Sequence, residues 1–111
     1  MRFPTQLALA AALALGALSV VAQDKPAAGD AARGKKMVSM CIGCHGIPAY
    51  RTAFPQVYSV PMIGGQSPGY IVAALKAYRS GERNHPSMVG IAKSLSDADM
   101  ADLAAHYGAP K

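Results

Sequence analysis

Apolar positions in the second half of the chain recur with the period of a helix. In "SPGYIVAALKAYRSG" they fall at i, i+3, i+4 and i+7, the spacing of one helix face. These positions are Ile71, Ala74, Leu75 and Tyr78. Ser67 and Pro68 are typical of a helix start and Gly81 of a helix end. The pattern therefore predicts a helix over residues 68–80.

A second stripe with the same period lies near the C-terminus, in "LSDADMADLAAHYG". Its members are Met100, Leu103, Ala104 and Tyr107. Ser96, followed three residues later by Asp99, resembles a capping box with Asp in place of Glu or Gln. Gly108 stands at the C′ position, where glycine commonly ends a helix. These features predict a terminal helix between Ser96 and Gly108.

An earlier helix is expected over residues 30–41, with Asp30 as its N-cap. Residues 46–66 then form a long loop with three prolines and three glycines, and residues 81–90 form a shorter one. A loop of that length without secondary structure is usually functional in a small domain. Alternating apolar and polar positions never run long enough for a sheet, so the predicted fold class is all-α with long ordered loops.

The N-terminal segment has the pattern of a secretory signal peptide. Arg2 precedes an apolar run over residues 7–21, which closes on small residues before "QDKPAAGDAA". A retained membrane anchor is the alternative, but the run is shorter than the roughly 18 residues that a spanning helix needs. We place cleavage after Ala22, which implies export to the periplasm.

Composition divides the chain into three parts. Residues 1–22 are the predicted signal peptide, residues 23–29 a flexible leader and residues 30–111 one folded domain. Cleavage leaves 89 of the 111 residues and lowers the net charge from +5 to +4, because Arg2 is the only charged residue removed. A domain this small usually needs disulfides, a metal or oligomerisation for stability, and a large apolar cofactor would serve the same purpose.

The stretch "MCIGCHG" holds the two cysteines of the chain, Cys41 and Cys44, followed directly by His45. A disulfide, half of a zinc site, a redox-active dithiol and a covalent haem anchor are all conceivable. Structural zinc needs four ligands and a thioredoxin-like dithiol needs a preceding strand, and the sequence shows neither. C-x-x-C-H is the attachment pattern of c-type haem. We therefore predict one haem c with thioether bonds to Cys41 and Cys44 and with His45 as an iron ligand.

The sixth ligand of the iron decides the function. Met88 in "NHPSMVG" is the leading candidate because it follows a proline-containing loop, and a thioether ligand raises the reduction potential. His85 is the rival, and an open site is the third possibility. Other methionines are assigned to packing in helices or, for Met62, to the wall of the haem pocket. The packing methionines are Met37, Met40 and Met100.

The second ring nitrogen of His45 also needs a partner, because that bond fixes the orientation of a ligating ring. The carbonyl of Pro61, in the turn "VPMIGG", is the expected acceptor. Three residues of the long loop are possible hydrogen-bond donors to the haem propionates: Tyr50, Arg51 and Tyr58.

With these residues assembled, the chain resembles the class I c-type cytochromes, particularly the small bacterial monohaem group related to cytochromes c4 and c553. "GKKMVSMCIGCHG" is similar to the first helix and haem motif of this family, and "VPMIGGQSPGYIVAALKAYRSGER" to its proline loop and middle helix. "HPSMVGIAKSLSDADMADLAAHYG" is similar to its axial-methionine loop and terminal helix. The resemblance implies a small cytochrome c fold, in which helices and long loops of residues 30–111 wrap around one covalently attached haem.

The resemblance also implies residue roles by position. These are covalent attachment by Cys41 and Cys44, axial ligation by His45 and Met88, and hydrogen bonding of His45 by the Pro61 carbonyl. Gly34 and Tyr107 stand where the first and last helices of the family cross closely. Val38 departs from the family, which often has an aromatic residue there. A two-domain cytochrome c4 would need a second C-x-x-C-H, so one haem is expected.

The residues and the resemblance both point to electron transfer between a redox donor and acceptor, without catalysis by the chain itself. A cationic rim could steer an acidic partner, and it would comprise Arg51, Lys76, Arg79, Arg83 and Lys93. We expect a monomer that meets membranes only through partner complexes and binds no nucleic acid. The alternatives are an electron-transfer subunit of a dehydrogenase or oxidase, and a haem enzyme or sensor with a labile distal ligand.

Overall fold

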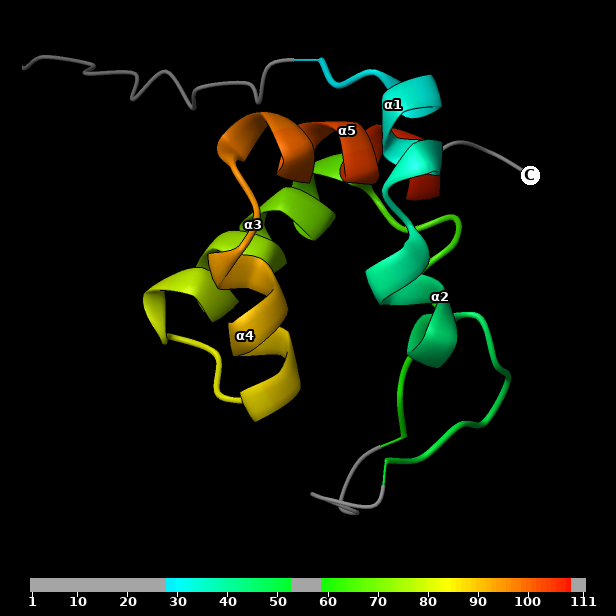
Figure 1. Ribbon diagram of the computed structural model, residues 1–111, viewed down its shortest axis with the longest axis vertical. Helices are drawn as coiled ribbons and strands as arrows, with labels where there is room; N and C mark the ends of the chain where they lie inside the picture. The colour runs from blue at the N-terminus through cyan, green and yellow to red at the C-terminus, as the bar shows by residue number, and fades with distance from the viewer. Residues whose placement is uncertain (1–27, 53–58, 109–111) are drawn as a thin grey trace, which may run out of the picture.

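The computed structural model describes residues 28–52 and 59–108, so the predicted signal peptide lies outside the described residues. These ranges contain five helices: α1 Ala31–Lys36, α2 Ser39–His45, α3 Pro68–Ser80, α4 Pro86–Lys93 and α5 Asp97–Tyr107 (Figure 1). Within the same ranges, the extended pairing is limited to an isolated antiparallel bridge between Arg51 and Ser59. The predicted all-α fold class is confirmed.

The prediction of one helix over residues 30–41 was wrong, because the chain forms two helices there. Asp30 caps α1 as expected, since its carboxylate accepts hydrogen bonds from the backbone N–H groups of Ala32 and Arg33 at 2.8 and 3.2 Å. The helix then closes in a tight turn, in which the N–H of Met37 bonds to the carbonyl of Gly34 at 3.0 Å. This turn redirects the chain, and α2 continues to His45.

The two helices predicted from apolar stripes are present with the expected ends. Gly81 ends α3 in the left-handed conformation, at φ +90°, which glycine adopts without strain. Ser96 and Asp99 form the predicted capping box at the start of α5. Gly108 follows α5 at φ −82°, so the left-handed conformation is not the reason for glycine there. A Cβ at Gly108 would instead lie 2.4 Å from the Pro68 ring, so glycine is needed because a larger side chain would clash with that ring.

Helix α4 was not expected, because residues 81–90 were read as a loop. His85 is its N-cap and Pro86 opens its first turn, a position that proline favours. The spacing of Met88, Ile91 and Ala92, at i, i+3 and i+4, is the helical signal that the reading missed.

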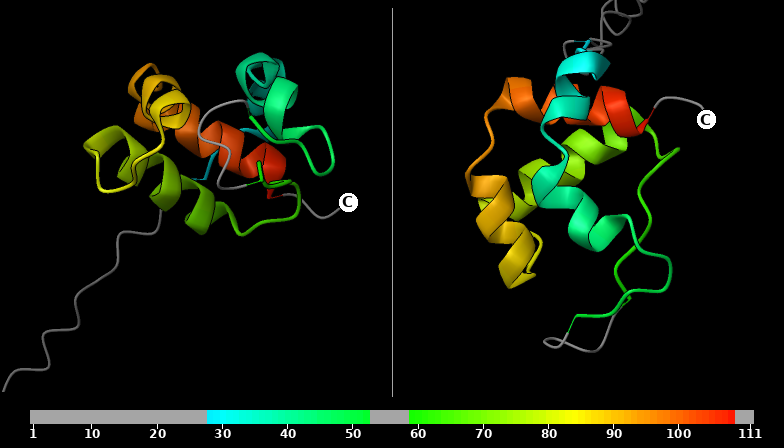
Figure 2. Two further views of the ribbon diagram at one scale, coloured as in Figure 1. Left: turned by 90° about the horizontal axis from the view of Figure 1, so that it is seen from below. Right: turned by 45° about the vertical axis from the view of Figure 1, so that its right-hand side comes forward.

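The core lies where α5 meets the other helices. α1 packs against α5, and α3 packs against both α4 and α5 (Figure 2). Among the residues that the structure describes, seven apolar side chains are buried: Ile71, Val72, Ala92, Leu95, Met100, Leu103 and Ala104. Met100 is fully buried and Met37 packs against the core, as predicted for both. Val38 joins this packing with its smaller side chain.

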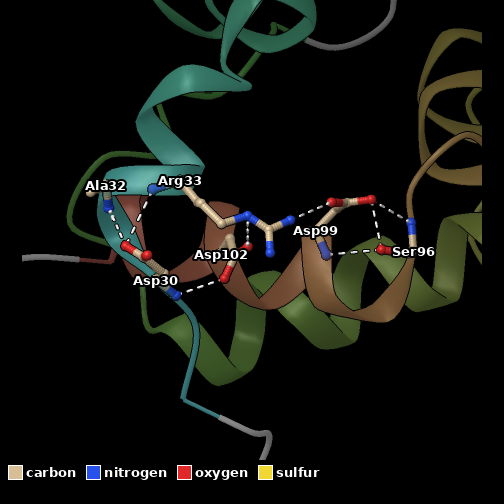
Figure 3. Close-up of polar contacts among 6 residues, drawn as sticks. All are labelled: Asp30, Ala32, Arg33, Ser96, Asp99 and Asp102. Carbon is tan, nitrogen blue, oxygen red and sulfur yellow. Dashed lines mark hydrogen bonds and ion pairs between the residues drawn. The ribbon is translucent and has the colours of Figure 1, made fainter.

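The crossing of α1 and α5 is held by close backbone contact and by a cluster of charged side chains (Figure 3). A Cβ at Gly34 would lie 2.1 Å from the Asp102 carbonyl oxygen, so only glycine allows this approach. The Asp102 carboxylate, whose side chain is 8% exposed, accepts the N–H of Asp30 at 2.6 Å and pairs with Arg33 Nε at 3.2 Å. These contacts fix α1 on α5 and thereby set where α2 lies.

Candidate haem site

An apolar pocket lies among α2, α3, α4, α5 and the loop that precedes α3. It opens to solvent, and the space free of protein atoms at this site, including solvent at its mouth, is about 400 Å³. Its apolar walls include Ile63, Ile71, Leu75, Ile91, Leu95 and Leu103. Cys41 and His45 line it from α2, and Met88 lines it from α4. α2 and α4 lie apart in the molecule (Figure 1), and both contribute to the lining of this one pocket, so the structure brings these three predicted site residues together.

His45, the last residue of α2, is oriented by the loop that precedes α3. Its Nδ1 lies 2.6 Å from the carbonyl oxygen of Pro61, so the hydrogen bond expected from the sequence is present. A carbonyl can only accept, and therefore Nδ1 carries the proton. The other ring nitrogen, Nε2, keeps its lone pair and is the nitrogen that can bind a metal.

Cys41 and Cys44 lie one helical turn apart on α2, both partly buried and with no disulfide between them. Burial raises the pKa of the Cys41 thiol, and a hydrogen bond with the Tyr107 side chain partly offsets this rise. Burial likewise raises the pKa of Tyr107, to about 12, and the nearby Cys41 adds to the effect. The sequence placed Tyr107 in a packing stripe and at a helix crossing, but gave no sign of its contact with Cys41.

Met88 occupies the first turn of α4, so the prediction that it lies outside any helical stripe was wrong. The side chain nevertheless lines the pocket, as a ligand at this position requires. His85, the rival ligand, is not among the residues that line the pocket, and its Nδ1 is buried without a hydrogen-bond partner.

Two methionines were placed wrongly from the sequence. Met62 was expected in the pocket wall, but it is 50% exposed, and its neighbour Ile63 lines the pocket instead. Met40 was assigned to packing, yet it is 49% exposed and lies at the pocket.

The predicted propionate partners are not brought to the pocket wall. Tyr50 and Arg51 are not among the lining residues, and Tyr58 lies outside the described residues. The predicted cationic rim is weaker than its five charges suggest. Asp97 pairs with Lys76 at 3.4 Å and with Arg79 at 2.6 Å.

The residues at the pocket fit a covalent haem. Haem c needs an apolar cavity for the porphyrin, two thiols one helical turn apart and an imidazole nitrogen with a free lone pair. The pocket offers the cavity, the Cys41 thiol and the His45 ring, and Cys44, which is not among the lining residues, lies one turn further along α2. In the described ranges, no group of three His, Cys, Asp or Glu side chains could hold a metal ion by itself. An all-α fold around such a pocket, with C-x-x-C-H at its edge, defines a c-type cytochrome.

Comparison with known proteins supports the same family, although no family model matches the chain. Cytochrome c-554(548) of Halomonas halodenitrificans is 42% identical over 83 residues, which cover 72% of this chain and 95% of the relative. Cytochrome c4 of Pseudomonas aeruginosa is 34% identical over 77% of this chain, but over only 40% of its own length. Cytochrome c-552 of Acidithiobacillus ferridurans is 33% identical over 89% of this chain and 45% of the relative.

The chain therefore belongs to the class I c-type cytochromes and is related to cytochrome c4. Its cofactor is haem c, bound covalently. Members of this family are electron carriers that work with redox partners and are not enzymes. The chain spans about two fifths of the length of the matched cytochrome c4.

Proposed function

We propose that this chain is a periplasmic electron carrier with one haem, attached through Cys41 and Cys44 and ligated by His45 and Met88. The observation that carries the proposal is the shared pocket. Cys41 and His45 line it from α2, and Met88 lines it from α4.

Bound haem c supplies a one-electron change in the oxidation state of its iron. The Pro61 carbonyl holds the His45 ring and its tautomer, so that Nε2 is the ring nitrogen left to bind the iron. The Met88 thioether, a soft and weakly basic donor, would favour the reduced state of a bound haem. The apolar walls would surround the porphyrin, and with both proposed ligands on the iron no position would remain for a substrate.

The donor and acceptor are proposed to be redox proteins that present acidic surfaces. Arg51 and Lys93 are exposed cations that could meet such a surface. The contribution of Lys76 and Arg79 is smaller because Asp97 pairs with both. We further propose that the carrier is a monomer, exported by the signal peptide of residues 1–22. In the part of the chain that the structure describes, none of the helices is both long and apolar enough to span a membrane.

Carbon monoxide binding by the reduced holoprotein tests this function. If Met88 ligates the iron, the wild type reacts slowly and Met88→Ala reacts at least tenfold faster, because that variant opens a position. Met62→Ala is the matched control, since this methionine is half-exposed and does not line the pocket. It should behave like the wild type.

Rapid carbon monoxide binding by the wild type would contradict the carrier function and favour a haem enzyme or sensor. Purification as a stable complex with a dehydrogenase or oxidase would favour the subunit alternative over a free carrier.

A further inference from the structure

Tyr107 contacts both segments that form the His45 side of the pocket. Its side chain lines the pocket together with Cys41 of α2, and the nearby Cys41 thiol helps to raise the pKa of the phenol. Its backbone carbonyl accepts a hydrogen bond of 2.7 Å from the N–H of Gly65. One residue of α5 thus joins α2 to the loop that precedes α3.

These contacts close a ring of interactions at the edge of the pocket. From Cys41, one turn of α2 leads to His45, whose ring bonds to the Pro61 carbonyl. The chain then runs from Pro61 to Gly65, which bonds to the backbone of Tyr107. The Tyr107 side chain completes the ring at Cys41. Both C-x-x-C-H residues that line the pocket are therefore fixed by the same closed set of contacts.

The Tyr107 side chain is held firmly enough to direct its hydroxyl group. Its ring packs edge-on against that of His106, with 5.0 Å between centroids, and contacts both clusters of the core. With a pKa of about 12, the phenol keeps its proton at any physiological pH. Once a cysteine sulfur is a thioether it has no proton to donate, so in the holoprotein the hydroxyl must be the donor.

We propose that Tyr107 is a positioning residue of the haem site, whose hydroxyl donates a hydrogen bond to the Cys41 sulfur and raises the reduction potential. This inference rests on the proposed attachment of haem through Cys41. The O–H dipole places its positive end at the edge of the cofactor, which favours the added electron. The ring alone could serve packing, whereas only the hydroxyl can serve this role.

The test is the reduction potential of the Tyr107→Phe holoprotein, because phenylalanine keeps the ring and removes only the hydroxyl. We expect the redox equilibrium to shift about threefold toward the oxidised form, or about 28 mV, since tenfold is 59 mV for one electron. Tyr78→Phe is the matched control: this ring is also half-buried against the core, but it lies near Arg83. Its potential should equal that of the wild type. An unshifted potential in Tyr107→Phe would overturn the proposal.

A second measurement needs no variant. In the NMR spectrum of the reduced wild type, the Tyr107 hydroxyl proton should exchange slowly with water and show a nuclear Overhauser effect to the Cys41 β-protons. Absence of that effect would also overturn the proposal, even if Tyr107→Phe did not accumulate. A wild type without covalent haem would instead refute the proposed function, so the two failures can be told apart.

Discussion

Gly34 shows how one missing side chain sets the position of the site. The backbone of α1 can approach Asp102 because Gly34 has no Cβ. The approach lets Arg33 and the N–H of Asp30 reach the same buried carboxylate. With α1 fixed in this way, the turn at Met37 sets the direction of α2, whose residues line the pocket.

The change Gly34→Ala should therefore destabilise the holoprotein by about 1–3 kcal/mol, because a Cβ would force the two backbones apart. Urea unfolding measures this cost. Gly90→Ala is the control, since a Cβ there meets nothing within 4 Å and Gly90 lies inside α4. It should raise the free energy of unfolding by about 0.5–1 kcal/mol. Equal effects of the two changes would contradict the close crossing of α1 and α5.

At the scale of the elements, the capping box at the start of α5 makes the stability of the protein depend on pH. Ser96 accepts the backbone N–H of Asp99 at 3.1 Å, and the Asp99 carboxylate accepts the N–H and the hydroxyl of Ser96 at 3.0 and 2.6 Å. These bonds from the Ser96 side chain and backbone hold the pKa of Asp99 below its ordinary value of 3.8. The ionised carboxylate is thus favoured in the folded state. Its contribution to stability is present above that ordinary pKa and is lost as the pH falls through the folded value.

The change Ser96→Ala should lower the free energy of unfolding by about 1 kcal/mol near neutral pH, because it removes the N-cap of α5. It should also flatten the loss of stability between about pH 5 and pH 3, since the Asp99 carboxylate loses its hydroxyl donor. Urea unfolding across this range measures both effects. Ser94→Ala is the control, because that hydroxyl bonds to the Ile91 carbonyl and not to Asp99. If the free energy of unfolding of Ser96→Ala still fell steeply with pH, the acid dependence would belong to other groups, such as the ion-paired Asp97.

Helices with local end signals could be predicted from the sequence, and those defined by packing could not. α3 and α5 carry proline, glycine or capping-box signals next to regular apolar stripes. The break between α1 and α2 has no such signal, because it depends on how Met37 and Val38 pack against α5. α4 was missed although Pro86 marks its start, because the stripe after it was not counted.

At the scale of the whole molecule, the pocket joins residues from most of the described chain. Cys41 and His45 could be recognised because C-x-x-C-H is local, and Met88 could be proposed by resemblance. The walls and the contact of Tyr107 with Cys41 could not be predicted, since they arise only when α5 packs against α1 and α3. That Ile63 lines the pocket where Met62 was predicted has a similar cause, because the path of the loop decides which of the two side chains faces inward.

The absorption spectrum of the wild-type protein, matured with cytochrome c assembly factors, tests the central claim most directly. The account predicts a haem that survives acid–acetone extraction and, in the oxidised form, the weak far-red band of a sulfur–iron bond. Covalent haem without that band would contradict ligation by Met88. Absence of covalent haem, where a control cytochrome matures normally, would contradict the haem site as a whole.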